Sequence, residues 1–458
     1  MIEEIDEKGF FWLPEKPEIK IPGTFSSSPA SGGSKLELFH PIELLSDEPI
    51  ISDRPYKFDV ILGHFLNGYE ITLVNCIETA EFKNYSVDKV FLGYHFKDKS
   101  EIKFRKVRFS LTFLNTWMNK SVFSFKKISE NSSQIEFVKP SPVSITSYKN
   151  IKVFLDTGVH ESYQSLNPSV KLDQQAFFTL ESEQDLIIDE YLEMLYFIRS
   201  FFCFVLTEPI YPLVMNGVLI NKEKENSQNP SRNTIVPIIL KTVGYPDKSK
   251  QPQPSIFYFT FRDIEKNLGT YFSNWFTNFE KLKSAIDLYF SAVHSLYKYP
   301  IDIFLSFVQV LEIYHRCSYR NSIMTKHEHK LRIKNIINTA PSDYQIWLKD
   351  KLAYSNEPSL KNRIKDLLSV NHTILSEFIP DEDTFIKKVV DTRNFNVHYD
   401  PRLKSKSLTG KELYNLGQKL KVLCELCFLR EIGFTDDLLI QFTTRNYRFH
   451  KILKDLAN

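Results

Sequence analysis

A change in hydrophobic periodicity about 270 residues into the chain does most to constrain its fold. Before that point, short apolar runs alternate with polar residues, which is typical of strands with one covered face. From about Ser273, apolar residues recur at the 3.6-residue spacing of amphipathic helices. We therefore predict an α+β multidomain protein, with a mostly antiparallel β region at residues 1–268 and an all-α helical bundle at residues 269–458.

The first part combines strand-like runs with turn signals. Asn67-Gly68 lies between two apolar runs, and both residues tolerate the positive φ that a type I′ hairpin turn requires. Pro22-Gly23 also indicates a turn, and the polar residues 221–233 indicate an exposed loop suited to binding a partner. A helix at about 186–206 interrupts the strands, which we expect at residues 60–62, 69–74, 90–92, 102–104, 107–111, 135–138, 151–155 and 234–240.

The second part predicts four or five helices joined by short loops, which is a helical bundle. Pro300 stands where a helix favours proline, at its first position. The apolar residues Leu282, Ile286, Tyr289 and Val293 follow one helical face before it. Further helices are expected at residues 301–316, 330–337, 359–368, 385–399 and 411–429.

Length and charge limit the kinds of function. A chain of 458 residues is too long for one ordinary core, so two or three domains are expected. The formal net charge is only +2, so any nucleic-acid binding must come from a local basic patch. No Walker A loop, G-x-G-x-x-G or H-E-x-x-H motif occurs, and we expect neither a cofactor nor a metal ion.

The sequence favours a cytoplasmic protein without a membrane segment. The first seven residues are acidic and lack the apolar core of a secretory signal. The most apolar run, residues 194–206, contains Arg199 and is shorter than the roughly 20 residues that span a bilayer. Five scattered cysteines do not resemble a disulfide framework.

One six-residue stretch, Arg393-Asn394-Phe395-Asn396-Val397-His398, carries the clearest chemical signal. It ends an amphipathic helical pattern and is closed by Pro401. An imidazole can transfer a proton near neutral pH, and a guanidinium can stabilise the charge that builds on a phosphate. This pair supplies what RNA cleavage without a metal requires.

The same spacing occurs a second time, at Arg445 and His450. That copy lies eight residues from the last residue, among basic side chains where fraying is expected. It fits a basic, solvated terminal helix that contacts RNA phosphate. We therefore place the site at the first copy, and whether the second contributes stays open.

The first copy and its flanking residues, Val389-Val390-Asp391-Thr392 and Tyr399-Asp400-Pro401, resemble the ApeA-like HEPN ribonucleases. The opening of the chain, residues 9–14 and 21–23, resembles the N-terminal domain that accompanies them. The resemblance implies a helical bundle over about 190 C-terminal residues. It also implies metal-independent cleavage of host RNA, with tRNA as one target, in anti-phage defence through abortive infection.

Helix geometry raises a question about the pair. Five residues on a regular helix turn through about 500°, which leaves the side chains of Arg393 and His398 roughly 140° apart. Either the helix ends before His398, or a second subunit completes the site, and the family resemblance implies a homodimer with two motifs at a two-fold axis. The alternative is a capped helix end with a surface histidine and an arginine ion pair.

Other charged and aromatic residues are candidates for supporting roles. Glu312 lies in an apolar helix, where a carboxylate needs a partner, and either Arg393 or Arg316 could supply it. The i,i+4 pair with Arg316 is the favoured interpretation, while a role in orienting Arg393 is the functional one. Tyr399 is expected to stack on a base, beside the RNA-binding residues Arg402, Lys404 and Lys406.

Two further patterns suggest metal or redox chemistry but have simpler explanations. Cys424 and Cys427 form a C-x-x-C within an apolar helical run, so buried packing is expected. His327-Glu328-His329 follows a polar segment predicted as a loop, and adjacent residues project in different directions. We assign neither cluster a metal.

These observations predict an endoribonuclease in which a β-rich sensor controls a helical nuclease. His398 would transfer protons, Arg393 would stabilise the phosphorane, and Asn394 would orient His398 or the phosphate. RNA, a second copy of the chain and a phage-derived protein activator are the expected partners. Two alternatives are a non-catalytic HEPN-like RNA-binding or dimerisation module, and a β-sandwich binding protein whose helical half only dimerises.

Overall fold

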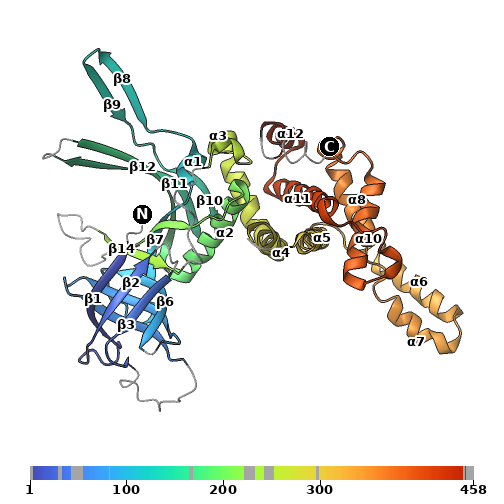
Figure 1. Cartoon of the computed structure of the whole chain (residues 1–458), viewed down its shortest axis with the longest axis horizontal. Coiled ribbons are helices and arrows are strands. Elements are labelled where there is room, and N and C mark those ends of the chain that lie inside the picture. The colour runs from blue at the N-terminus through green and yellow to red at the C-terminus, as the bar shows by residue number, and fades with distance from the viewer. Residues whose placement is uncertain are drawn as a thin grey trace. The chain divides into compact units, whose positions relative to one another are not determined.

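The computed structural model describes residues 4–28, 33–42, 55–81, 83–164, 169–220, 233–241, 252–295, 299–446 and 449. The chain separates into two compact units, Met1–Gly269 and Thr270–Asn458 (Figure 1). The first is built mainly from antiparallel strands and the second from helices, which confirms the predicted α+β class. The predicted loop at residues 221–233 lies outside the described residues apart from Asn233. No described helix has the length and apolar character needed to cross a membrane.

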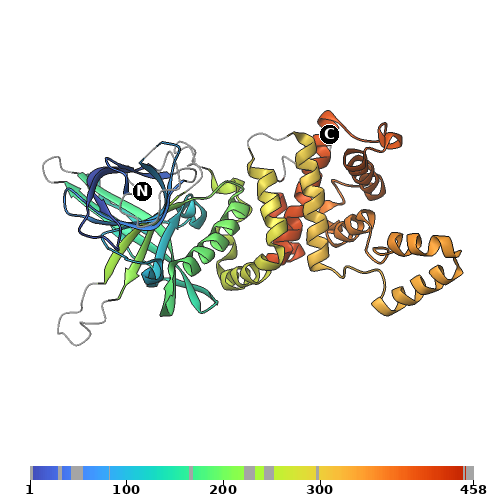
Figure 2. The ribbon, with the colours of Figure 1, turned by 90° about the horizontal axis from the view of Figure 1, so that it is seen from below.

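A closed six-stranded barrel forms half of the N-terminal unit. Its strands follow the order β6-β3-β2-β1-β4-β5, and β5 pairs back to β6 (ring of blue strands in Figure 2). Side chains that alternate along each strand fill the barrel, among them Phe11, Phe25 and Leu73. The strands are β1 (Ile5–Trp12), β2 (Ile21–Ser28), β3 (Gly33–Leu38), β4 (Lys57–Phe65), β5 (Glu70–Glu78) and β6 (Asn84–Leu92).

Two turn predictions in the barrel need correction. Pro22-Gly23 lies inside strand β2 rather than in a turn, because both residues pair with β1. The β4–β5 hairpin is confirmed, but of the two turn residues only Gly68 has a positive φ, of 82°. The Gly68 amide donates to the carbonyl oxygen of Phe65 at 2.8 Å, so the turn is a three-residue loop that ends in a left-handed glycine.

A second antiparallel sheet continues from the barrel through β6. Its order is β10-β11-β12-β7-β13-β14, and β14 pairs with residues 89–91 of β6. Helix α2 (Ile188–Leu206) covers one face, where the Tyr191 hydroxyl donates to the carbonyl oxygen of Phe104 at 3.0 Å. The strands are β7 (Lys103–Leu111), β10 (Val143–Tyr148), β11 (Ile151–Gln164), β12 (Ser169–Ile187), β13 (Pro212–Leu219) and β14 (Thr234–Leu240).

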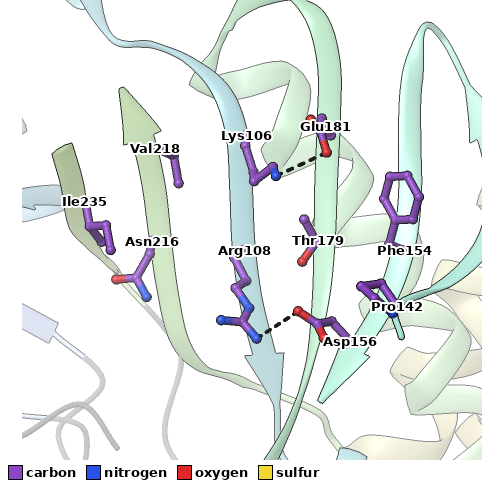
Figure 3. A pocket seen from close by; sticks show the side chains of 10 residues that line it. All are labelled: Lys106, Arg108, Pro142, Phe154, Asp156, Thr179, Glu181, Asn216, Val218 and Ile235. Atoms are coloured by element: carbon purple, nitrogen blue, oxygen red, sulfur yellow. Dashed lines mark hydrogen bonds and ion pairs between the residues drawn. The ribbon is translucent and has the colours of Figure 1, made fainter. Parts of the chain in front are cut away.

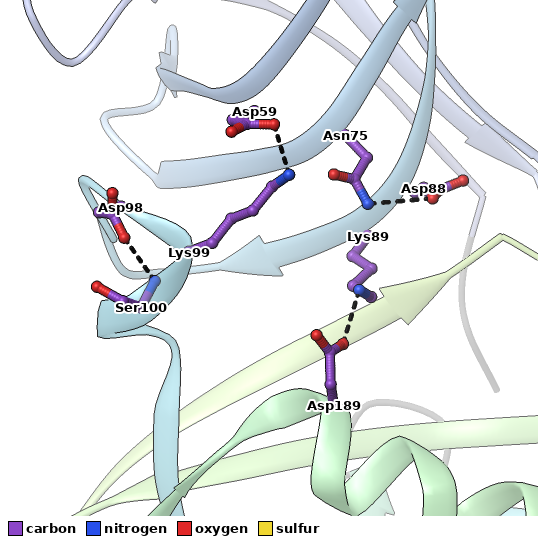
Figure 4. A network of polar contacts seen from close by, with 8 residues as sticks. All are labelled: Asp59, Asn75, Asp88, Lys89, Asp98, Lys99, Ser100 and Asp189. Atoms are coloured by element: carbon purple, nitrogen blue, oxygen red, sulfur yellow. Dashed lines mark hydrogen bonds and ion pairs between the residues drawn. The ribbon is translucent and has the colours of Figure 1, made fainter.

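Polar contacts tie the barrel to its surroundings within this unit (Figure 4). Lys89 on β6 pairs with Asp189 at the start of α2, at 2.9 Å. Lys99, which begins the short turn before β7, pairs with Asp59 on β4. The unit is completed by the exposed hairpin of β8 (Phe123–Ser129) and β9 (Ser132–Phe137) and by the short helices α1 (Leu114–Met118) and α3 (Phe261–Ile264).

The C-terminal unit is a bundle centred on the buried helix α11. Apolar side chains of α5 and α11, among them Phe307, Leu311 and Leu423, are buried in its core. Inside that core Glu425 accepts from the Tyr289 hydroxyl at 2.5 Å and pairs with Lys421 at 2.9 Å. The helices are α4 (Leu268–His294), α5 (Pro300–Ser318), α6 (Lys326–Thr339), α7 (Ser342–Lys351), α8 (Leu360–Val370), α9 (His372–Leu375), α10 (Glu382–His398), α11 (Gly410–Ile432) and α12 (Asp436–Arg445).

Candidate active site

Helix α10 carries the motif at its C-terminal end. The Asp381 carboxylate caps the N-terminus by accepting from the amide of Thr384 at 3.0 Å, and this hydrogen bond lowers the pKa of Asp381. Phe385, Ile386 and Val389 are buried against the bundle, so the helix is fixed along one side. No residue of the motif is buried, and its last three residues are exposed.

The side chains of Arg393 and His398 meet within one chain. Nη1 of Arg393 lies 3.3 Å from Nε2 of His398, so the expectation that the two side chains do not meet on one helix is wrong. The helix continues to His398, but the long arginine side chain spans the angle between the two positions. Since a guanidinium can only donate, Nε2 of His398 is the acceptor in this arrangement.

Glu312 on α5 approaches the same guanidinium. Its Oε2 lies 3.8 Å from Nη2 of Arg393, and both side chains are about three-quarters buried, with exposed fractions of 23% and 27%. The favoured sequence interpretation, a pair between Glu312 and Arg316, is wrong because Arg316 pairs with Glu357 at 2.8 Å. Glu312 thus holds one side of Arg393 while His398 contacts another nitrogen.

Asn394 contacts Arg393 rather than His398. Its Oδ1 accepts from Nη1 of Arg393 at 3.1 Å, so three side chains surround one guanidinium. Tyr399 follows as the C-cap of α10 in the left-handed region, with φ of 50°. The residue is 74% exposed, and its ring stacks on Phe395 with 5.6 Å between centroids. An exposed ring beside the pair is in position to stack on a base.

The predicted RNA-binding cations lie on the segment after Tyr399. Arg402, in the short helix η6 (Pro401–Leu403), is 88% exposed and forms two side-chain hydrogen bonds to Asp400, at 3.0 and 2.8 Å. Those bonds lower the pKa of Asp400. Lys404 and Lys406 are exposed. Among the described residues, no contact joins these three cations to Arg393 or His398.

A buried hydroxyl folds this segment back on α10. The Thr392 side chain, which is fully buried, accepts from the amide of Leu408 at 3.1 Å. Asn396 donates to the Thr392 carbonyl oxygen at 2.8 Å. The backbone that carries Lys404 and Lys406 is therefore held beside the last turns of the motif helix.

The second copy of the motif is described only in part. Arg445 ends α12 and is exposed, while Asn446 is 3% exposed. The prediction that this part of the chain is solvated is therefore wrong at Asn446 and also at Phe449, which is 2% exposed. His450 lies outside the described residues.

A buried charged cluster beside Glu312 was missed from the sequence. Arg363 on α8 is 1% exposed, and its Nη1 donates to Nδ1 of His315 at 3.0 Å. The imidazole in turn donates from Nε2 to Asp366 at 3.0 Å. Burial lowers the pKa of His315, an effect that its hydrogen bond to Asp366 opposes. The signal available was an arginine at the centre of an apolar helical stripe, next to Ile364 and Leu367.

The two other candidate clusters have structural roles. Cys424 and Cys427 are buried in α11, as predicted, and burial raises the pKa of both thiols. His327 and His329 lie in the first turn of α6, not in a loop, because Thr325 and Glu328 form a capping box there. His329 contacts the Ser355 hydroxyl at 2.9 Å.

The N-terminal unit has a candidate ligand pocket on the sheet face opposite α2. Two cross-strand ion pairs lie on its floor, Arg108–Asp156 at 3.1 Å and Lys106–Glu181 at 3.2 Å (Figure 3). The cavity has a volume of about 380 Å³, and Asn216 also lines it. The Arg108 guanidinium lies 3.8 Å from the centroid of the Phe177 ring. This size is within the range of small-molecule sites.

Comparison with known families accounts for both units. Residues 6–275 match the ApeA N-terminal domain 1, and residues 305–438 match the Apea-like HEPN domain. The second match includes Glu312, Arg393 and His398 but ends before Arg445. No curated protein and no solved structure matches the chain. HEPN domains are generally ribonucleases, and the matches show that this chain belongs to the ApeA-like HEPN proteins, with an ApeA N-terminal domain ahead of its HEPN domain.

Proposed function

We propose that the protein is a metal-independent endoribonuclease whose active site is built around Arg393 and His398. The 3.3 Å approach of Nη1 of Arg393 to Nε2 of His398 is the observation that carries the proposal. This contact supports the proposal because an imidazole, which can transfer protons, and a guanidinium, which is a permanent cation, lie together at an exposed helix end. The HEPN family match over the same residues supports it.

The proposed reaction breaks one P–O bond. The ribose 2′-oxygen attacks the adjacent phosphorus, its proton passes to a base, and the 5′-oxygen of the next nucleotide leaves with a proton from an acid. The products are a 2′,3′-cyclic phosphate and a 5′-hydroxyl. Arg393 stabilises the additional negative charge of the phosphorane, held in place by Glu312 and Asn394. His398 serves as a proton-transfer group.

The same geometry supports a homodimer. In an in-line displacement the attacking and leaving oxygens lie on opposite sides of phosphorus, so one imidazole at one place does not serve both. A second copy of the motif, related by a two-fold axis, would supply the second imidazole. Val397 and Tyr399, which are 51% and 74% exposed, offer apolar surface for that contact beside the pair.

We further propose that the nuclease acts in anti-phage defence by cleaving host RNA, with tRNA as a candidate, in abortive infection. The N-terminal unit would act as the sensor and would bind a phage-derived protein activator. The pocket around Arg108 and Asn216 supports a binding role for this unit, since it lies on a sheet face that α2 does not cover. A non-catalytic RNA-binding or dimerisation module is the alternative.

Incubation of the purified protein with total RNA in excess EDTA tests the proposal. We expect cleavage to persist, with products that carry 2′,3′-cyclic phosphate and 5′-hydroxyl ends. RNA that is bound but never cut, with or without added divalent metal, would favour the non-catalytic alternative. Cleavage that EDTA abolishes and Mg²⁺ restores would overturn the proposed mechanism.

A further inference from the structure

Helices α6 and α7 form a hairpin that projects from the helical unit (Figures 1 and 2). Neither helix has a buried residue, although both belong to a unit with a large apolar core. Residues 326–354 carry six lysines and arginines against three acidic residues, a net charge of +3, while the whole chain carries +2. This projecting segment is therefore a local basic surface in a nearly neutral protein.

Three of the six cations of the hairpin are arranged along one face of α6. Lys326, Lys330 and Lys334 follow one another at i, i+4 and i+8 on α6, so they lie about 6 Å apart along the axis. All three are exposed. Within the described part of the chain, none of the six cations of the hairpin takes part in an ion pair. A row of evenly spaced cations without carboxylate partners suits a polyanion with regularly spaced charges.

Exposed aromatic rings accompany the cations on α7. Tyr344 and Trp347 stand at i and i+3, with exposed fractions of 59% and 56%. The other three tryptophans of the chain, Trp12, Trp117 and Trp275, are at most 6% exposed. Exposed rings next to lysines are the combination that binds unpaired nucleic acid, since bases stack on the rings while cations contact phosphates.

The base of the hairpin is fixed to the helix that presents Glu312. The backbone amide and carbonyl of Met324 both hydrogen bond to the Asn356 side chain, at 3.0 and 3.1 Å. Glu357 pairs with Arg316 at 2.8 Å, one turn beyond Glu312 on α5. Buried Arg363 donates to Asn321 at 2.5 Å. These contacts hold the hairpin at a defined place relative to the pair of Arg393 and Glu312.

We propose that the α6–α7 hairpin is an RNA-binding arm that holds an unpaired stretch of the substrate, with phosphates on the α6 lysines and bases on Tyr344 and Trp347. The inference rests on the proposed function and deepens it, because it names single-stranded RNA, such as a loop, as the form recognised. RNA accounts for both the uncompensated charge and the rings, whereas an apolar protein surface accounts for the rings alone.

Binding of the full-length protein to a 2′-O-methyl single-stranded RNA of about 12 nucleotides tests the arm. This probe has no attacking 2′-hydroxyl, so it stays intact whichever residues are catalytic. Trp347→Ala is expected to weaken binding about 5- to 150-fold, the effect of losing one stacked base. The double variant Lys330→Gln, Lys334→Gln is expected to lose two phosphate contacts. The slope of log K against the logarithm of the salt concentration should then become shallower by about 1.4.

Matched controls separate the arm from general electrostatics and from folding. Phe125→Ala with Lys126→Gln and Lys127→Gln makes the same kind of change on the exposed β8–β9 hairpin and should leave binding unchanged. Trp347→Phe keeps a ring and should retain most of the affinity, while RNA quenching of tryptophan fluorescence should disappear. Duplex RNA of the same length should bind more weakly, because its bases are already stacked.

The outcomes distinguish this inference from the proposed function. If the wild type cleaves RNA but the arm variants bind the probe as the wild type does, the RNA-binding role of the hairpin is wrong. The proposed ribonuclease activity is then unaffected. If the probe binds through the arm but unmodified RNA is never cut, the proposed ribonuclease activity is wrong. The RNA-binding role of the hairpin is then supported. Conversion of a dimer to a monomer by Trp347→Ala, with RNA affinity unchanged, would identify the rings as a protein contact and overturn the inference.

Discussion

Nη1 of Arg393 donates to Nε2 of His398 across 3.3 Å, although the two residues lie on different faces of α10. The hydrogen bond requires an imidazole that is unprotonated at Nε2. A phosphate that enters between the two side chains would take over the guanidinium and release the imidazole nitrogen. In the proposed mechanism, His398 would then be free to accept a proton beside the bound phosphate.

Replacement of His398 by alanine should abolish RNA cleavage and cellular toxicity while the fold is kept. A loss of about 10²- to 10⁴-fold in rate is expected from removal of a proton-transfer group. His372→Ala is a suitable control, because His372 is exposed and pairs with Glu382 at the opposite end of α10. Cleavage that survives in His398→Ala but is lost in His450→Ala would move the site to the second copy.

Glu312→Gln should reduce kcat by up to about 10²-fold, because the Arg393 guanidinium loses its ionic anchor and shifts from the productive position. Single-turnover cleavage at saturating RNA measures the effect. Glu377→Gln removes an exposed carboxylate from the same unit and should change nothing. Equal rates for Glu312→Gln and wild type would show that the contact only stabilises the fold.

Dilution of wild-type protein with His398→Ala protein, at constant total concentration, should reveal a two-chain site. If each site needs a histidine from both chains, an equal mixture retains about one quarter of the activity, whereas independent monomers retain about one half. Sedimentation under assay conditions checks that the chains exchange. Full activity from a strict monomer would rule out the dimer.

The stability of the helical unit should fall as the pH drops below about 6.5. Burial lowers the pKa of His315 in the folded chain, so the unfolded chain, with an ordinary histidine pKa of about 6.5, binds the proton first. The free energy of unfolding then decreases with falling pH until the folded pKa is reached. His315→Gln should flatten this dependence in thermal unfolding between about pH 5 and pH 8; an unchanged pH profile would contradict the assignment.

A fragment of residues 270–458 should be more toxic to cells than the full chain if the N-terminal unit restrains the nuclease. Restraint requires the activator to bind the active state more tightly than the resting one. Introducing His398→Ala into the fragment controls for toxicity unrelated to cleavage. A fragment that folds and dimerises but is no more active than the whole chain would show that the N-terminal unit has another role, such as substrate delivery.

Much of the fold could be predicted because hydrophobic periodicity reports burial. Pro300 correctly indicated the start of α5, and the apolar stripe through Phe385 and Val389 correctly indicated α10. Helix α7 was missed because it buries no residue and therefore has no apolar stripe. The extent of α6 was underestimated for the same reason, so its two histidines were placed in a loop.

The sequence proposed the residues of the candidate site, but it did not predict the contacts between them. Spacing along α10 suggested that Arg393 and His398 diverge, since it describes where side chains start and not how far an arginine reaches. The partner of Glu312 depends on which helix packs beside α5, and that helix brings Arg393. Arg316, the partner expected from the sequence, pairs instead with Glu357, which lies 41 positions further along the chain. Such pairings follow from tertiary packing, which a single sequence does not display.

Strand β6 belongs to the barrel and to the second sheet at once, because its residues 84–87 pair with β3 and its residues 89–91 pair with β14. A shared strand cannot leave one assembly without opening the other. The N-terminal unit is therefore expected to unfold in one cooperative step, although it contains both a barrel and a second sheet. A ligand that stabilises the sheet around Arg108 would therefore also slow hydrogen exchange at the backbone amides of the barrel. Binding at the sheet would in this way stabilise the whole N-terminal unit.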